Sequence, residues 1–240
     1  MAIEAPSSPQ PATRLPNHRS AAVPLALLGV LILALALPRL GNAVLAMDGH
    51  QFADGLRGGA IPPVASEIGA AARGLGALPH WLRDADSEAT RGYLLARQAD
   101  ITLDAAERRR LLAEALVALD NALATSPGEA RWWLHRAWLN QQMGDPTAAL
   151  RSLRMSLLVG PAEPHLIQSR LSLAGTLLPV MDAETREMVE RSVRLAMVVS
   201  SDQVIGLMGD PNVAALVRHA GPFPTADDKG DARRPGGSGR

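Results

Sequence analysis

The stretch that decides the fold is Ala130 to Pro161, ARWWLHRAWLNQQMGDPTAALRSLRMSLLVGP. Apolar side chains recur in both of its halves at intervals of three and four residues. They are Ala130, Trp133, Leu134, Ala137 and Trp138, then Ala149, Leu150, Leu153, Leu157 and Leu158. Such spacing places one apolar stripe on each of two α-helices. We therefore predict two amphipathic helices that cover their stripes by packing against each other.

The residues between the two halves predict a tight turn. Gly144 adopts a left-handed conformation without strain, so it suits the end of the first helix. Asp145 suits the cap of the second helix, and Pro146 suits its first turn, where a missing N–H costs nothing. Pro161 stands just past the expected end of the second helix. The stretch is thus expected to form an antiparallel helical hairpin.

The hairpin repeats along the chain. At an offset of 34 residues the identical pairs are Ala115/Ala149, Leu116/Leu150, Leu119/Leu153, Leu123/Leu157, Pro127/Pro161 and Glu129/Glu163. A period in the low thirties with helix–turn–helix content is typical of a helical solenoid. The chain is therefore predicted to be all-α.

The hairpin resembles a tetratricopeptide (TPR) repeat. The matching positions are Trp133 and Ala137 in the first helix, Gly144 and Asp145 at the turn, Ala149 and Leu153 in the second helix, and Pro161 at the end. Three residues depart from the family pattern: Arg136 replaces a usual Leu, Asn140 a usual Tyr, and Ser156 a usual Ala. The resemblance implies a short solenoid with a concave groove for a protein segment.

Carried onto this sequence, the family's groove would be lined by residues of the first helix of the hairpin. These residues are Arg131, Leu134, Trp138, Gln141 and Gln142. Trp138 lies at the edge of the apolar stripe, so both core packing and ligand contact stay open for it. Trp133 lies on the stripe and is expected in the core. Trp132 falls off the stripe and is a possible exposed contact.

Weaker hairpins flank the central one. A first is expected from a cap at Asp86 or Ser87 to about Thr125, and a third has its second helix capped by Asp182. Asp210 and Pro211 begin a last short helix that ends near His219. The predicted organisation is a disordered tail at 1–19, a transmembrane helix at 20–38, a linker with a weak helix at 39–85, a TPR-like domain at 86–220 and a disordered tail at 221–240.

Residues 20–38, SAAVPLALLGVLILALALP, are nineteen residues without a charge. As a helix they extend about 28 Å, which is close to the thickness of the hydrocarbon core of a bilayer. Cleavage after Val44-Leu45-Ala46 is the alternative, but an uncleaved anchor is preferred because the apolar run is long. With a short leader and the folded mass after the span, the domain is expected in the periplasm of a bacterium, held at the inner membrane by a single pass.

Composition excludes several classes of function. The 24 basic residues equal the 24 acidic ones, so no basic surplus favours nucleic acid. The chain has no cysteine, which removes disulfides, thiolate metal sites and cysteine nucleophiles. The six histidines are scattered without ligand spacing, and no phosphate-binding glycine loop or hydrolase motif is present. We expect no metal, no cofactor and no small-molecule substrate.

Two charged clusters remain. Asp48, His50 and Asp54 follow the apolar run, and a carboxylate beside His50 would suit a small membrane-bound hydrolase or lyase. A polar linker is the preferred interpretation. The run 108–110, three consecutive arginines, points in three directions around a helix and is expected to be solvated.

Anchor plus repeats predict a non-catalytic adaptor that binds protein partners of the bacterial envelope. The architecture and the run GPAEPHLIQSRLSL resemble TPR proteins of exopolysaccharide and O-antigen assembly, which implies a role in envelope polysaccharide biosynthesis or export. An ancillary translocon chaperone and a cytochrome c maturation subunit are the alternatives, because both also look like an anchor with periplasmic repeats.

Overall fold

The computed structural model describes residues 18–60, 64–77, 79, 83–199 and 201–221, which form helices and no strand. The expected tails fall outside this part of the chain, except at 18–19 and 221. The helices are α1 His18–Arg57, α2 Ala65–Gly76, α3 Ala85–Asp100, α4 Ala105–Thr125, α5 Ala130–Gln142, α6 Pro146–Val159, α7 Pro164–Leu177, the short 3₁₀ helix η2 Leu178–Val180, α8 Ala183–Val199, α9 Ser201–Leu207 and α10 Pro211–His219. The all-α class is confirmed.

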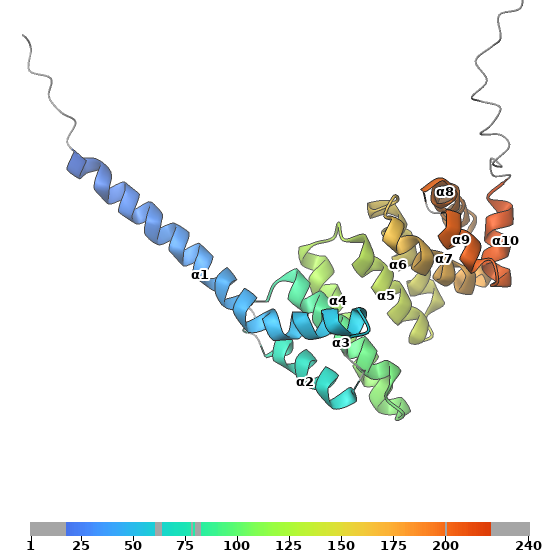
Figure 1. Cartoon of the computed structure of the whole chain (residues 1–240), viewed down its shortest axis with the longest axis horizontal. Coiled ribbons are helices and arrows are strands. Elements are labelled where there is room, and N and C mark those ends of the chain that lie inside the picture. Colours follow the sequence, from blue (N-terminus) through green and yellow to red (C-terminus); the bar gives the residue numbers. More distant parts are fainter. Residues whose placement is uncertain (1–17, 61–63, 78, 80–82, 200, 222–240) are drawn as a thin grey trace, which may run out of the picture.

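Successive helices stack as hairpins (Figure 1). Helix α3 packs on α4 and α5 packs on α6, while α7 contacts α8, α9 and α10. The hairpins at α3/α4, α5/α6 and α7/α8 lie where the sequence places them, and α10 ends at His219 as expected. Helix α9 was not predicted. The arrangement is compatible with a TPR-like fold.

The central turn forms as its residues predict. Gly144 has a φ of 81°, the left-handed conformation in which a Cβ is strained. The N–H of Asp145 donates to the carbonyl of Asn140 at 2.9 Å, which satisfies an acceptor at the end of α5. The carboxylate of Asp145 accepts from the N–H of Ala148 at 2.8 Å, with Pro146 in the first turn of α6. Local chemistry therefore fixes this hairpin.

Two of the three departures from the TPR pattern tie α5 to its neighbours. Arg136 Nε donates to Asp120 of α4 at 2.6 Å, and its Nη1 donates to Ser152 Oγ of α6 at 2.9 Å. Asn140 Nδ2 lies 3.4 Å from the same Ser152 hydroxyl, which is buried. Charge-assisted bonds of this kind are stronger than neutral ones. The polar substitutions thus link three consecutive helices.

The third departure, Ser156, holds a buried arginine. Its hydroxyl donates to the carbonyl of Ala130 at 2.8 Å and accepts from Arg170 Nε at 3.0 Å. Arg170, only 1% exposed, also donates to the carbonyls of Ser156 at 2.6 Å and Gly160 at 2.7 Å. Burial lowers the pKa of Arg170. A cation against the last carbonyls of α6 is favoured by the helix dipole.

Ala149 is fully buried at the contact between α5 and α6, as the repeat predicts. We expect Ala149→Leu to lower the free energy of unfolding by about 1–3 kcal/mol, because the added carbons overpack a filled core. The measurement is a thermal melt beside Ala113→Leu, whose site on α4 is exposed. Equal melting temperatures for the two variants would mean that α5 and α6 do not meet at residue 149.

Helix α5 lies between two cores. Its Leu134 and Ala137 belong to the core that α6, α7, α8 and α10 share. Its Trp132 and Leu139 belong to the core formed with α1, α2, α3 and α4. Since each core needs one side of α5, this helix is covered on two faces and holds the N-terminal and C-terminal halves together.

Most of the region 39–85 is not the expected linker. Helix α1 runs on to Arg57, where Ala46 and Ala53 are buried among α2 and α3. Gly49 allows close contact with α2, since a Cβ there would lie 2.8 Å from Leu75 Cγ. The start of α3 also differs from the prediction, because its cap is Asp84, which accepts from the N–H of Ser87 at 2.8 Å. The described residues of this region that form α2 and the end of α1 are thus part of the folded body.

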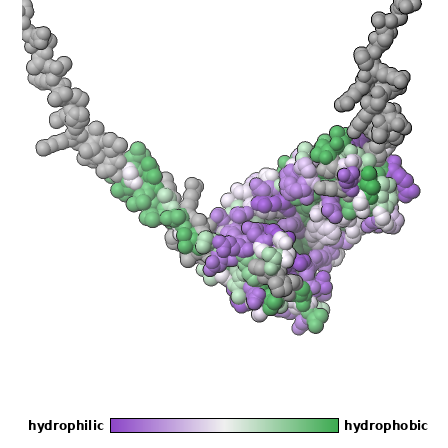
Figure 2. Space-filling model, in the orientation of Figure 1, coloured by the Kyte–Doolittle hydropathy of each residue, from purple (hydrophilic) through white to green (hydrophobic). Residues whose placement is uncertain are grey.

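The apolar run at 20–38 is helical as the N-terminal part of α1. Among the residues that the structure describes, no helix has both the length and the apolar character needed to cross a membrane. The side chains of residues 20–26 lie outside the described part. From Leu28 to Leu33 the large apolar side chains are exposed, and Figure 2 shows them as an apolar band that projects from the body.

Candidate functional site

A polar cavity of about 480 Å³ lies between α1, α3 and α5. Its lining combines two guanidinium groups, two imidazoles, two carboxylates and one hydroxyl. The residues are His50, Asp54 and Arg57 of α1, Asp86, Ala89 and Thr90 of α3, and Arg131, Trp132 and His135 of α5. Four further cavities of the described residues each bring together fewer charged side chains. This is the candidate site.

Helices α3 and α5 present side chains in the same register, and the first two positions of each helix line the cavity. The positions are Asp86, Thr90, Tyr93 and Arg97 on α3, and Arg131, His135, Trp138 and Gln142 on α5. Both sets have the spacing i, i+4, i+7 and i+11, which is one face of a helix. We call this shared surface the groove face.

On α3 the groove face is covered by the chain itself. His50 Nδ1 lies 3.1 Å from Thr90 Oγ1 and 3.8 Å from Asp86, and the Arg57 guanidinium lies 4.5 Å from the centre of the Tyr93 ring. Cation–π contacts of this length are attractive. Helix α1 therefore occupies the groove face of α3, and α5 carries the part that is open.

A smaller cavity of about 110 Å³ continues along α5. Tyr93, His135, Trp138 and Gln142 line it together with apolar groups of α3 and α4. His135 stacks on Tyr93, with ring centres 6.2 Å apart, and borders both cavities. The open groove face thus passes from a charged cavity at Arg131 to an aromatic one at Trp138.

The imidazole of His135 is uncharged at neutral pH. Burial, and then the positive charges of Arg57 and Arg131, lower its pKa to about 4. One ring nitrogen is therefore a hydrogen-bond donor and the other an acceptor. The two guanidinium groups that act on His135 come from different helices, α1 and α5, and both line the same cavity.

The predicted groove residues divide into two groups. Arg131, Trp138 and Gln142 line the cavities. Leu134 is wrongly placed by the prediction: it is 2% exposed and belongs to the C-terminal core. Gln141 is half-buried, lines neither cavity, and its Oε1 is buried without a hydrogen-bond partner in the described residues.

The burial of Trp132 and Trp133 differs from the prediction made from a single apolar stripe on α5. Trp132, expected as an exposed contact, is 5% exposed and packs in the N-terminal core. Trp133 is only partly buried against that core, and its Nε1–H donates to the carbonyl of Pro127 at 2.8 Å. Because α5 is covered on two sides, the residue beside the stripe is buried as well.

The alternative catalytic cluster does not assemble. His50 is held by Thr90, and Asp54 accepts from Arg57 Nη1 at 2.6 Å. Asp48 is exposed and does not line the cavity. Neither Asp48 nor Asp54 forms a hydrogen bond or an ion pair with His50 in the described part of the chain. The run 108–110 is exposed as expected, and Arg110 pairs with Glu107 and Glu114.

No protein-family model, curated protein or solved structure matches the chain.

Sequence reasoning missed the contribution of α1 to the site. His50, Asp54 and Arg57 have the spacing i, i+4 and i+7, the same as the groove face of α3. Ala46 and Ala53 stand four residues before His50 and Arg57, so the buried alanines lie beside the site residues on the same side of α1. Because these apolar residues are small, they are a weak signal of a packed helix face.

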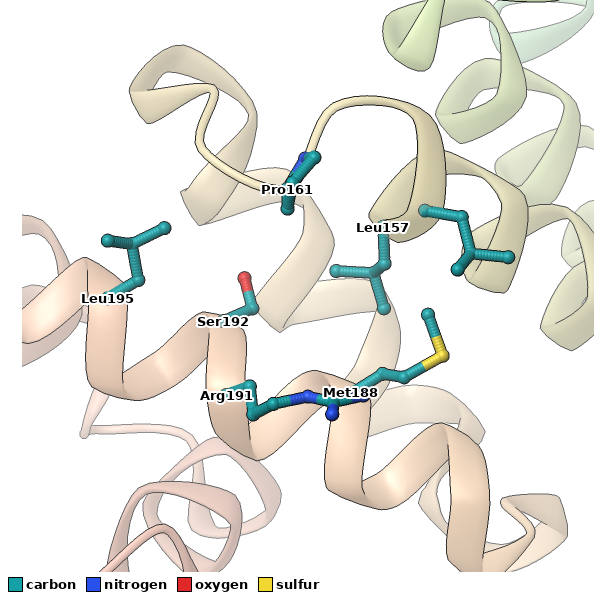
Figure 3. Close-up of a pocket in the computed structure, with 7 residues that line it drawn as sticks. Leu157, Pro161, Met188, Arg191, Ser192 and Leu195 are labelled. Atoms are coloured by element: carbon teal, nitrogen blue, oxygen red, sulfur yellow. The ribbon is translucent and has the colours of Figure 1, made fainter.

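A more apolar cavity of about 300 Å³ lies between α6 and α8 (Figure 3). Leu157 and Met188 line its floor, and Pro161 and Leu195 face each other across it. Arg191 is its one charged lining residue. Its chemistry differs from that of the groove face, where donors and acceptors converge.

Proposed function

We propose that the chain is a membrane-anchored, non-catalytic adaptor with a TPR-like solenoid that binds a segment of a protein partner. The observation that carries this proposal is the open groove face of α5, with Arg131, Trp138 and Gln142 at its two cavities. Trp and Arg are the residue types that contribute most to protein interfaces. The shape, two adjoining hollows on one helix, suits a chain segment that lies along α5.

The groove face of α5 has an equivalent surface on α7. At the repeat offset of 34 residues its positions are His165, Ser169, Ser172 and Thr176. All four are exposed or half-exposed, and their hydroxyl and imidazole groups both donate and accept hydrogen bonds. Such a surface complements the polar backbone of an extended segment. The partner's segment would then cross α5 and α7.

We place the adaptor at the bacterial inner membrane, with its body in the periplasm. The support is the uncharged run 20–38 together with the exposed apolar side chains of α1. We further assign it to envelope polysaccharide biosynthesis or export, on the TPR resemblance and the anchored architecture. Neighbouring genes for glycosyltransferases would support that pathway, and genes for haem-lyase or translocon components would replace it.

The adaptor function is tested by removing two groove side chains outside the core. Arg131→Ala with Gln142→Ala should abolish capture of envelope partners by the full chain, because both residues line the open cavities. Stability should hardly change, since the side chain of Arg131 is half exposed and Gln142 is exposed. The measurement is a pull-down from solubilised envelopes, with circular dichroism of each variant.

The matched control is Arg109→Ala with Gln51→Ala, two exposed residues that line neither cavity. This control should retain all partners. Unchanged capture by the Arg131/Gln142 variant with intact helicity would contradict the groove adaptor and move the interaction to another surface.

A further inference from the structure

The polar cavity contains guanidinium N–H groups that form no hydrogen bond with the described residues. Arg131 enters no hydrogen bond among the described residues, and its nearest carboxylates are Asp86 at 3.5 Å and Glu129 at 3.7 Å. Arg57 donates from Nη1 to Asp54 and leaves its other nitrogens without a hydrogen bond in the described part. A guanidinium has five N–H donors, so both side chains retain donors for a ligand.

The acids of the cavity lie toward solvent. Their side chains are 72% exposed at Asp54 and 61% at Asp86, whereas those of Arg57 and Arg131 are 41% and 50% exposed. Charges in contact with water are screened more than charges in a cavity. Burial is the main cause of the lowered pKa of His135, and the positive charges of Arg57 and Arg131 lower that pKa further, without an opposing carboxylate. The inner surface is cationic.

We propose that this cavity is an anion site shared between two helices, in which Arg57 of α1 and Arg131 of α5 bind a carboxylate or phosphate group. His135, which lines the same cavity, adds one N–H donor. The inference rests on the proposed function, because the anion would be carried by the partner's segment, with the adjoining apolar hollow at Trp138 taking a neighbouring side chain. Arginine forks suit both carboxylate and phosphate geometry.

A consequence is that binding of the anion and packing of the C-terminal part of α1 on α3 stabilise each other. Helix α1 supplies Arg57 only while its C-terminal part is packed on α3 through the Thr90 and Tyr93 contacts. An anion that bridges Arg57 and Arg131 adds a link between α1 and α5. By linkage, whatever binds only the seated form stabilises that form.

The test uses the full chain in a neutral detergent with inorganic phosphate and succinate as probes and glycerol as the uncharged probe. Titration calorimetry at constant ionic strength should show saturable binding of at least one anion and none of glycerol. Arg57→Gln and Arg131→Gln should each weaken binding about tenfold, the size of one charge-assisted hydrogen bond. Arg97→Gln is the control, because Arg97 shares the groove face but pairs with Asp100.

Amide hydrogen exchange of residues 46–57 should slow in the presence of the bound anion, and not in Arg131→Gln. Binding of succinate alone indicates an acidic peptide, and binding of phosphate alone a phosphorylated group. The proposal is overturned if neither anion binds, or if the three arginine variants weaken binding equally. If Arg57→Gln leaves both anion binding and partner capture unchanged while the Arg131/Gln142 variant loses its partners, the adaptor stands and the shared anion site fails.

Discussion

Replacing Arg170 by Met should lower the free energy of unfolding by about 3–5 kcal/mol, because the change leaves several buried acceptors without a donor. The carbonyl of Gly160 loses its bond from Arg170, the carbonyl of Ser156 keeps only the bond from the N–H of Gly160 at 3.3 Å, and the Ser156 hydroxyl loses a partner. Met has a similar length, so the loss is one of hydrogen bonds more than of volume. Urea denaturation with a linear extrapolation measures it.

The control is Arg109→Met on the exposed surface of α4, which should change stability by less than about 0.5 kcal/mol. Arg170→Lys should fall between the two, since an ammonium cannot reproduce the fork of the guanidinium. If Arg170→Met and Arg109→Met unfold at the same urea concentration, the buried bonds contribute no net stability and the departure at Ser156 has no structural role.

A second prediction concerns membrane insertion of the apolar run at the N-terminal part of α1. Leu28→Arg together with Leu33→Arg should cost about 5–7 kcal/mol of membrane insertion, at about 2.5–3.5 kcal/mol for each charge near the centre of a span. We expect the double variant to leave the membrane fraction after an alkaline carbonate wash, while the parent chain stays.

Leu103→Arg is the matched control, because Leu103 is fully exposed on the body and a charge there should leave the fractionation unchanged. N-terminal sequencing of the membrane fraction adds a separate check. A mature chain that begins at Met47 would show that the run is removed, and the proposal of an uncleaved anchor would be wrong. A double variant that stays in the membrane would equally contradict the anchor.

The parts of the fold that were predictable depend on local chemistry. The turn at Gly144, Asp145 and Pro146 follows from backbone conformations and caps that involve neighbours within a few residues. The same holds for Asp182, whose carboxylate accepts from the N–H of Thr185 at 2.7 Å. That hydrogen bond lowers the pKa of Asp182, so the carboxylate stays charged to a lower pH than an ordinary aspartate.

The parts that were not predictable depend on tertiary contacts. A single apolar stripe cannot show that α5 is covered on two faces, so the burial of Trp132 was missed. Leu134 lies on the stripe and is buried, and only the groove register of the TPR family assigned it to the groove. The segment after residue 39 was taken for a linker because glycines lower helix propensity. In the fold, Gly49 is what lets α1 approach Leu75, and packing overrides propensity there.

Only the part of the candidate site that lies within one hairpin could be predicted, because the rest depends on tertiary contacts. Arg131, Trp138 and Gln142 follow from the repeat register within one hairpin. His50 and Arg57 of α1 lie 36 to 40 residues before the α3 side chains that they contact. Contacts over such sequence separations leave no local pattern beyond the spacing of His50, Asp54 and Arg57 on one side of α1.

In the proposed anchored form, the unbroken helix α1 would fix the distance between the membrane and the groove face. From Pro38, the last residue of the proposed span, to His50 at the cavity there are twelve residues of one helix, which at ~1.5 Å per residue make a strut about 18 Å long. A flexible tether of the same length would let the body sample many heights and orientations. In the proposed anchored form, a helical strut would instead hold the groove face at one height above the bilayer, so the proposal predicts capture only of segments that pass close to the lipid surface. Soluble proteins that stay away from the membrane would not reach the groove face, whatever the fit of their side chains.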